Sequence, residues 1–220
     1  MIPGRNYQTL LVTQEGGVVR VTLNRPERRN AIGPTMVNEL LYVLSDVHTD
    51  SEARVLVLTG AGKAFCAGGD FAQMTSGADR DALPVKGDYA DLLLALCRAT
   101  KPVVARVNGH AMGGGLGLVA ASTFAVATTE VELGTPEINV GLFPMMIMAV
   151  LARLVPRRRL VEMMISGERL KATEAAALGL VNRAVPPEQL DEVVEATVSM
   201  LLSKSPAALH HGLDAFAMQD

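Results

Sequence analysis

Tryptophan is absent from the 220 residues, cysteine occurs only twice, and aromatic residues make up just 4% of the chain. Cys66 and Cys97 show no CxxC spacing, which argues against a disulfide framework or a zinc site. Charge of neither sign dominates, because the formal net charge is -3, and this gives no electrostatic case for binding nucleic acid or a membrane surface. The sequence also lacks an uncharged run of membrane-spanning length and a signal-peptide pattern, so we expect a cytoplasmic protein.

Strand-like and helix-like segments alternate through the first part of the chain. A hairpin is predicted around the Glu15-Gly16-Gly17 turn, and a helical period begins at Pro34. Further strands are predicted at 55–58, 103–107 and 123–127, and a further helix at 89–97. From Pro144 onward the pattern is helical throughout. The sequence therefore predicts an α/β core over 1–143, followed by a helical C-terminal region over 144–220.

The most informative stretch is VVARVNGHAMGGGLGLV (Val103–Val119), where a strand passes through a glycine-rich turn into a helix. Such a turn leaves backbone N–H groups at the helix N-terminus, and these groups bind negative charge. The charge can belong to a phosphate or to the oxygen of a reacting carbonyl. Because Gly113, Gly114 and Gly115 carry no Cβ, a ligand can approach the main chain closely. A tight packing turn explains the glycines equally well.

A second glycine turn, at Gly68-Gly69, suggests that two backbone donors converge on one oxygen. An oxyanion hole needs two such N–H groups close to the developing charge. Glu137 follows Pro136 soon after the Gly113–Gly115 turn and is the best-placed acid to serve as a base. On local sequence alone, a solvated loop carboxylate is the plainer interpretation of Glu137.

Other motifs match known sites less well. Gly60-Ala61-Gly62-Lys63 lacks the glycine spacing and hydroxyl residue of a phosphate loop. The GxGxxA pattern from Gly115 to Ala120 fits a dinucleotide fingerprint, but Glu130 and Glu132 come early for a ribose contact. Cys66 could be a nucleophile, although a buried small apolar residue is the simpler interpretation.

Five stretches, taken in order, resemble the crotonase, or enoyl-CoA hydratase/isomerase, superfamily. They are LNRPERRNAI (Leu23–Ile32), LTGAGKAFCAGGDF (Leu58–Phe71), KPVVARVNGHAMGGGLGL (Lys101–Leu118), TPEINVGLFP (Thr135–Pro144) and SGERLKATEAAALGLVNRAVP (Ser166–Pro186). The resemblance covers nearly the whole chain. It implies a crotonase-like fold, a spiral of ββα units with a helical C-terminal region.

The resemblance also implies roles for individual residues. The family's two oxyanion donors fall on Gly69 and Gly114, and its Pro-Glu glutamate falls on Glu137. The segments that hold the coenzyme A moiety correspond, largely through backbone, to Arg28, Ala31, Ala67, Gly68, Asp70 and Phe71. Coenzyme A is part of the substrate, so we expect neither a separate cofactor nor a metal.

The sequence departs from the family's pattern at two places. Many members carry a second catalytic glutamate three residues after the second donor glycine, and here that position is Gly117. Relatives also usually continue into further helices that build a trimer and cover the ligand, whereas this sequence stops at Asp220. We therefore expect that part to be missing or reorganised.

Hydration of an enoyl-CoA is simplest with two acids, whereas moving a double bond from C3 to C2 needs a single base. Glu137 with Gly117 therefore favours a one-glutamate isomerase. A 2-enoyl-CoA hydratase, a non-catalytic acyl-CoA-binding protein and an acyl-CoA hydrolase remain alternatives. By resemblance we expect a homotrimer or a dimer of trimers, with Met163, Met164 and Ile165 suggesting a subunit contact.

Overall fold

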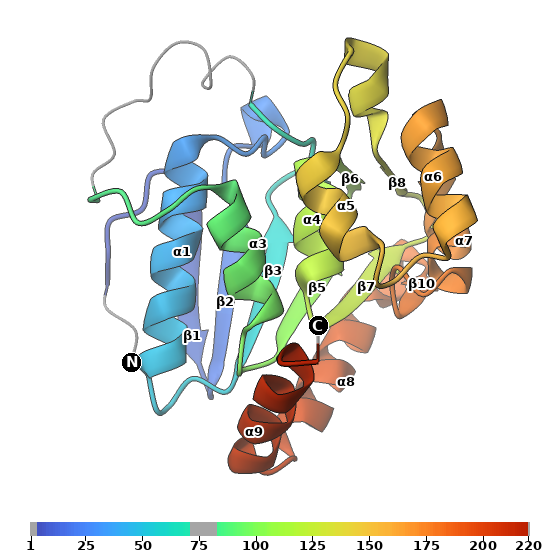
Figure 1. Ribbon diagram of the computed structural model, residues 1–220. Coiled ribbons are helices and arrows are strands. Elements are labelled where there is room, and N and C mark those ends of the chain that lie inside the picture. The colour runs from blue at the N-terminus through green and yellow to red at the C-terminus, as the bar shows by residue number, and fades with distance from the viewer. Residues whose placement is uncertain (1–3, 71–82, 220) are drawn as a thin grey trace.

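The computed structural model describes residues 4–70 and 83–219, and Figure 1 shows their arrangement. The strands are β1 (Leu10–Glu15), β2 (Val18–Leu23), β3 (Val55–Gly60), β4 (Ala64–Cys66), β5 (Val103–Val107), β6 (His110–Met112), β7 (Phe124–Thr128), β8 (Glu132–Gly134), β9 (Arg169–Lys171) and β10 (Arg183–Val185). The α-helices are α1 (Pro34–Thr49), α3 (Tyr89–Cys97), α4 (Gly114–Ala121), α5 (Met145–Leu151), α6 (Arg157–Ser166), α7 (Ala172–Ala177), α8 (Leu190–Leu202) and α9 (Pro206–Ala217). Short 3-10 helices are η1 (Pro26–Arg28), η2 (Pro136–Val140) and η3 (Pro187–Gln189).

The strands form two sheets. The larger has the order β1-β2-β3-β5-β7-β10 and is parallel except for β1, which forms the predicted hairpin with β2. The smaller has the order β4-β6-β8-β9, with β4, β6 and β8 parallel and β9 antiparallel to β8. Two consecutive strands in the chain thus enter different sheets before a helix follows, as in β3-β4-α3 and β5-β6-α4. The α/β class and the ββα units predicted from the sequence are confirmed.

The larger sheet is buried on both faces, which explains why its central strands β3 and β5 are mostly apolar. In β3, Leu56 and Leu58 pack into the main core on the side of α1 and α3, which lie side by side in Figure 1. Val55 and Val57 point the other way and pack with Val194 and neighbouring side chains of α8. Successive strand residues face opposite sides of a sheet, so one run of valine and leucine serves both layers.

The C-terminal region differs from the prediction because it is not entirely helical. β9 pairs with β8 in the smaller sheet, and β10 pairs with β7 in the larger one. Each of these strands has only three residues, RLK and RAV. Segments this short carry no readable period-2 pattern, and pairing with strands already in place determines their conformation.

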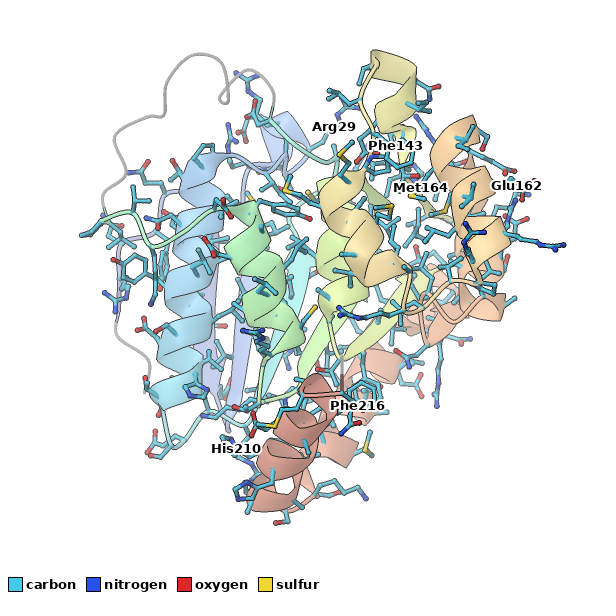
Figure 2. The ribbon with its side chains drawn as sticks, in the orientation of Figure 1. Arg29, Phe143, Glu162, Met164, His210 and Phe216 are labelled. Carbon is cyan, nitrogen blue, oxygen red and sulfur yellow. The ribbon has the colours of Figure 1, made fainter. Side chains whose placement is uncertain are left out.

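The expected subunit contact on α6 is wrong for two of its three residues. Met163 and Met164 are 0% and 3% exposed and belong to the core, whereas Ile165 is 61% exposed. Figure 2 shows Met164 on the side of α6 that faces the molecule and Glu162 on its outer side. The helix period places the two methionines inward, so they cannot form a surface for another subunit.

Within the described ranges, no helix combines the length and the apolar character needed to cross a membrane.

Candidate active site

The three residues predicted to carry the chemistry follow three neighbouring strands of the smaller sheet. Gly69 follows β4, Gly114 follows β6 and Glu137 follows β8, each within three residues of the strand's last residue. Because β4, β6 and β8 are parallel, their carboxyl ends lie at the same edge of the sheet. Ligand sites commonly form outside the carboxyl ends of parallel strands. The fold therefore brings together three turns that are far apart in the sequence.

Gly69, Gly114 and Glu137 line one cavity of about 540 Å³. Its wall is mostly apolar and includes the continuous segment from Leu142 to Met146. Further apolar lining comes from Ile32, Pro34, Val37 and Ile147. An apolar cavity with a few convergent polar groups is the usual form of a small-molecule site.

The Gly114 N–H is available to a ligand because of its place at the start of α4. The first N–H groups of a helix have no acceptor within the helix. The adjoining Gly113 N–H donates to the Gly134 carbonyl at 2.9 Å, and the Gly113 carbonyl accepts from the Gly117 N–H at 3.1 Å. Within the described residues the Gly114 N–H itself donates to no protein acceptor.

The Gly69 N–H is available for a different reason. The Gly68 carbonyl accepts from the Ile32 N–H, and the Asp70 N–H donates to the Ile32 carbonyl, both at 2.8 Å. Ile32 and Gly69 thus form an isolated parallel bridge in which both hydrogen bonds of Ile32 go to the neighbours of Gly69, so the Gly69 N–H points away from Ile32. No acceptor for it is found in the described part of the chain.

The carboxylate of Glu137 packs against the glycine turn before α4. Gly113 has φ 50, and a Cβ built on it would lie 2.7 Å from Glu137 Oε1, so only glycine leaves room for this carboxylate. Glu137 Oε2 is buried and has no hydrogen-bond partner among the described residues. Burial raises the pKa of Glu137, because removal from water disfavours the charged form. Glu137 is therefore a half-buried side chain and not a fully solvated loop carboxylate.

The two segments expected to hold coenzyme A lie side by side next to Gly69. The Ala67 N–H donates to the Arg29 carbonyl at 3.0 Å. Arg25 Nη1 donates to the Asp70 carboxylate at 2.9 Å and to the Ala31 carbonyl at 3.3 Å. The expected contact residues Arg28, Ala31, Ala67, Gly68 and Asp70 are in these segments, beside the cavity lining. Phe71 lies outside the described residues.

Figure 2 shows Arg29 and Phe143 at the same end of the molecule, which is where these segments and the wall of the cavity meet.

The other candidate sites find less support. Burial raises the pKa of the Cys66 thiol to about 12, so Cys66 is poorly suited to act as a thiolate nucleophile. No group of three or more histidine, cysteine, aspartate or glutamate side chains placed to hold a metal occurs among the described residues.

Sequence reasoning missed Tyr89, which also lines the cavity. Its hydroxyl donates to the Gly114 carbonyl at 2.6 Å. The local sequence places Tyr89 at the start of a predicted helix, and helical periodicity cannot show that its ring reaches a turn in another segment.

Known proteins resemble this chain in both sequence and structure. A model of the family described as enoyl-CoA hydratase/isomerase matches residues 13–219. Hydroxycinnamoyl-CoA hydratase-lyase of Pseudomonas fluorescens is 35% identical over 216 residues, covering 96% of this chain and 78% of the relative. Short-chain-enoyl-CoA hydratase of Clostridium acetobutylicum is 32% identical over 204 residues, covering 91% of this chain and 77% of the relative. The crystal structure of enoyl-CoA hydratase from Mycobacterium smegmatis superposes with a TM-score of 0.89 at 39% identity, covering 96% of this chain and 83% of that structure's chain.

Proposed function

The chain belongs to the enoyl-CoA hydratase/isomerase family of enzymes and has its crotonase fold, and from this premise we propose that it isomerises a 3-enoyl-CoA thioester to the 2-enoyl form. In this proposal Glu137 is the single acid–base group. The Gly69 and Gly114 N–H groups bind the thioester oxygen, and the segments around Arg28, Ala31, Ala67, Gly68 and Asp70 hold the coenzyme A moiety.

The proposed reaction transfers one proton and shifts one double bond. Glu137 removes a proton from C2, and the electron pair of that C–H bond moves into the thioester as an enolate. Two hydrogen bonds from Gly69 and Gly114 stabilise the charge on the enolate oxygen. The electrons then return through C2 and C3, and the proton that Glu137 holds is delivered to C4. The product contains the double bond between C2 and C3, conjugated with the carbonyl.

The observation that carries the one-acid proposal is the state of the acids lining the cavity. Asp88 lines it too, but its carboxylate accepts hydrogen bonds from the Ala90 and Asp91 N–H groups at the start of α3. Within this described lining, Glu137 is the acid with a buried carboxylate oxygen, Oε2, that has no hydrogen-bond partner. Its raised pKa also suits a group that must both take up and release a proton.

Hydration of a 2-enoyl-CoA is the second candidate, and the names of relatives favour it. The matched proteins of Clostridium acetobutylicum and Mycobacterium smegmatis are both called enoyl-CoA hydratases. Hydration would require water to be activated and a proton to be supplied at C2, with Glu137 taking both roles in turn.

The test follows 3-enoyl-CoA, 2-enoyl-CoA and saturated acyl-CoA substrates for isomerisation, hydration and thiol release. We expect isomerisation by the wild type, a loss of about 10²–10⁴-fold in Glu137→Gln, and little change in the exposed control Glu130→Gln. Hydration without isomerisation would establish the second candidate. Thiol release would indicate a hydrolase, and binding without turnover a non-catalytic protein.

We also propose assembly as a homotrimer or a dimer of trimers. Support comes from the resemblance and from large apolar side chains that are exposed outside the cavity lining, including Val140 in η2, Ile165 in α6 and Phe216 in α9. Exposed apolar surface of this kind can mark a contact between proteins. Sedimentation at micromolar concentration is expected to give a trimer or hexamer, and a monomer would contradict the proposal.

A further inference from the structure

Gly117 is the position at which the family resemblance places a second glutamate, and in this chain another side chain fills the space. A Cβ built on Gly117 would overlap the Tyr89 hydroxyl and lie 2.5 Å from Ile147 Cγ2. The site therefore has no vacancy at 117. Tyr89, from the start of α3, occupies the volume that an acidic side chain on α4 would enter.

The Tyr89 hydroxyl contacts the oxyanion turn directly. It donates to the Gly114 carbonyl at 2.6 Å, and the ring carbon that bears the hydroxyl lies 3.4 Å from the Cβ position of Gly114. On the other side of the turn, the Gly113 N–H is bound by the Gly134 carbonyl at 2.9 Å. The peptide unit that carries the Gly114 N–H is thus bracketed by hydrogen bonds before and after it.

This bracketing matters because three successive glycines form the turn. Glycine populates a wide range of backbone angles, so an unrestrained Gly113–Gly115 segment would present the Gly114 N–H in many directions. A donor contributes fully to catalysis only when it is already aimed at the oxygen before the charge develops. The Tyr89 bond restrains the carbonyl side of the residue whose N–H is the donor.

Tyr89 is itself held firmly enough to act as a restraint. The residue before it, Asp88, caps α3, and the Asp91 carboxylate accepts from the Asp88 N–H at 2.9 Å. Burial is the main cause that raises the pKa of Tyr89. The hydroxyl therefore keeps its proton near neutral pH and remains a donor.

We propose that Tyr89 is a positioning residue of the oxyanion hole and acts through the Gly114 carbonyl. Its hydroxyl lies in the space next to Gly117, the position at which the family resemblance places a second glutamate. The role rests on the proposed function in one respect, that the Gly114 N–H binds a thioester oxygen. It does not depend on which reaction follows.

The test uses Tyr89→Phe, which removes the hydroxyl and keeps the ring, with Tyr42→Phe as the matched control. Tyr42 also donates to a backbone carbonyl, that of Pro84 at 3.1 Å, but it is outside the cavity lining. The probe is a saturated acyl-CoA labelled with carbon-13 at the thioester carbonyl. Its infrared stretch is compared free and bound, because hydrogen bonding to the oxygen lowers this frequency and no turnover is needed.

We expect a clear shift in the wild type and in Tyr42→Phe, and a smaller shift in Tyr89→Phe. In steady-state assays Tyr89→Phe should lower kcat by about tenfold with little change in KM, as expected for the loss of one net hydrogen bond felt mainly in the transition state. Gly117→Ala provides a second variant, because its Cβ displaces the hydroxyl without removing it, and it should reduce the shift as well.

A wild-type shift in folded Tyr89→Phe would overturn the positioning role and leave the proposed function intact. If Tyr89→Phe does not fold, an unchanged shift in Gly117→Ala would overturn it instead. The absence of a shift in the wild type would overturn the oxyanion hole and this inference together. Reduced shifts in the variants without isomerisation by the wild type would refute the proposed reaction alone.

Discussion

At the scale of single residues, Glu137 shows how position in the fold changes the chemistry of a side chain. The local sequence, a carboxylate one residue after a proline in a turn, favours a solvated group. The structure instead places one oxygen of Glu137 against Gly113 and buries the other without a partner in the described chain. Burial of a carboxylate oxygen without a partner costs free energy, so the proposed acid–base group should lower stability.

The prediction at this scale concerns stability and pH. The folded-state pKa of Glu137 is raised above its unfolded value, so its contribution to stability is fully present below the unfolded pKa and is lost as pH rises through the folded pKa. Glu137→Gln removes this loss. Urea unfolding should therefore show the variant to be more stable than the wild type at pH 7–8, with the difference vanishing near pH 4. A less stable variant at neutral pH would contradict the burial argument.

At the same scale, the sequence contains the three central residues but not their environment. Gly69, Gly114 and Glu137 were identified through the resemblance, whereas composition and spacing left each of them with a plainer explanation. Tyr89 was not identified at all, because its contact with Gly114 joins the start of α3 to the start of α4. Contacts of this kind depend on how two helices pack, and neither helix encodes them alone.

At the scale of elements, α4 is a helix that is buried along almost its whole length. Its residues from Gly115 to Ala121 are all buried, so it is apolar on every side and shows no amphipathic pattern. Its glycines allow close approach by other segments. At Gly117 those neighbours are the Tyr89 hydroxyl and Ile147.

We expect Gly117→Ala to destabilise the protein although alanine is the better helix former. Overpacking typically costs about 1–3 kcal/mol, which exceeds the roughly 1 kcal/mol that alanine gains over glycine inside a helix. Gly212→Ala in α9 is the matched control, because a Cβ there meets nothing within 4 Å and the change should stabilise. Urea unfolding of the two variants measures both effects. Stabilisation by both would show that Tyr89 and Ile147 yield readily.

The link between η1 and the Gly69 turn gives a second prediction for elements. The Arg25 and Asp70 side chains are only 13% and 6% exposed, so their ion pair lies largely out of water. Asp70→Asn should cost roughly 1.5–3 kcal/mol, the range for a hydrogen bond to a charged group. Asp191→Asn breaks the Arg106 pair, in which Asp191 is 77% exposed, and should cost less than about 1 kcal/mol. Equal losses in urea unfolding would contradict the importance of burial.

Long periodic elements were predictable and short paired ones were not. The helix predicted to begin at Pro34 is α1, and the helix predicted at 89–97 matches α3 in full. β9 and β10 were not predicted, because three residues carry too little pattern. Their conformation depends on the strands with which they pair.

At the scale of the whole molecule, the division into two sheets was the feature least visible in the sequence. The strands of the smaller sheet have three residues each. Read locally, β4 and β6 are parts of glycine-rich turns. Their pairing is set by the larger sheet, which holds β3, β5 and β7 in parallel order and so aligns the segments that follow.

The placement of Gly69, Gly114 and Glu137 after three strands of that sheet also has a consequence in time. Pairings between segments distant in the sequence bear a loop-closure cost and form slowly, whereas local helices form early. During refolding from urea, helical circular dichroism should thus return before enzymatic turnover, since turnover requires β4, β6 and β8 to be in register together. Formation of the active site would then be the last step in the folding of each molecule.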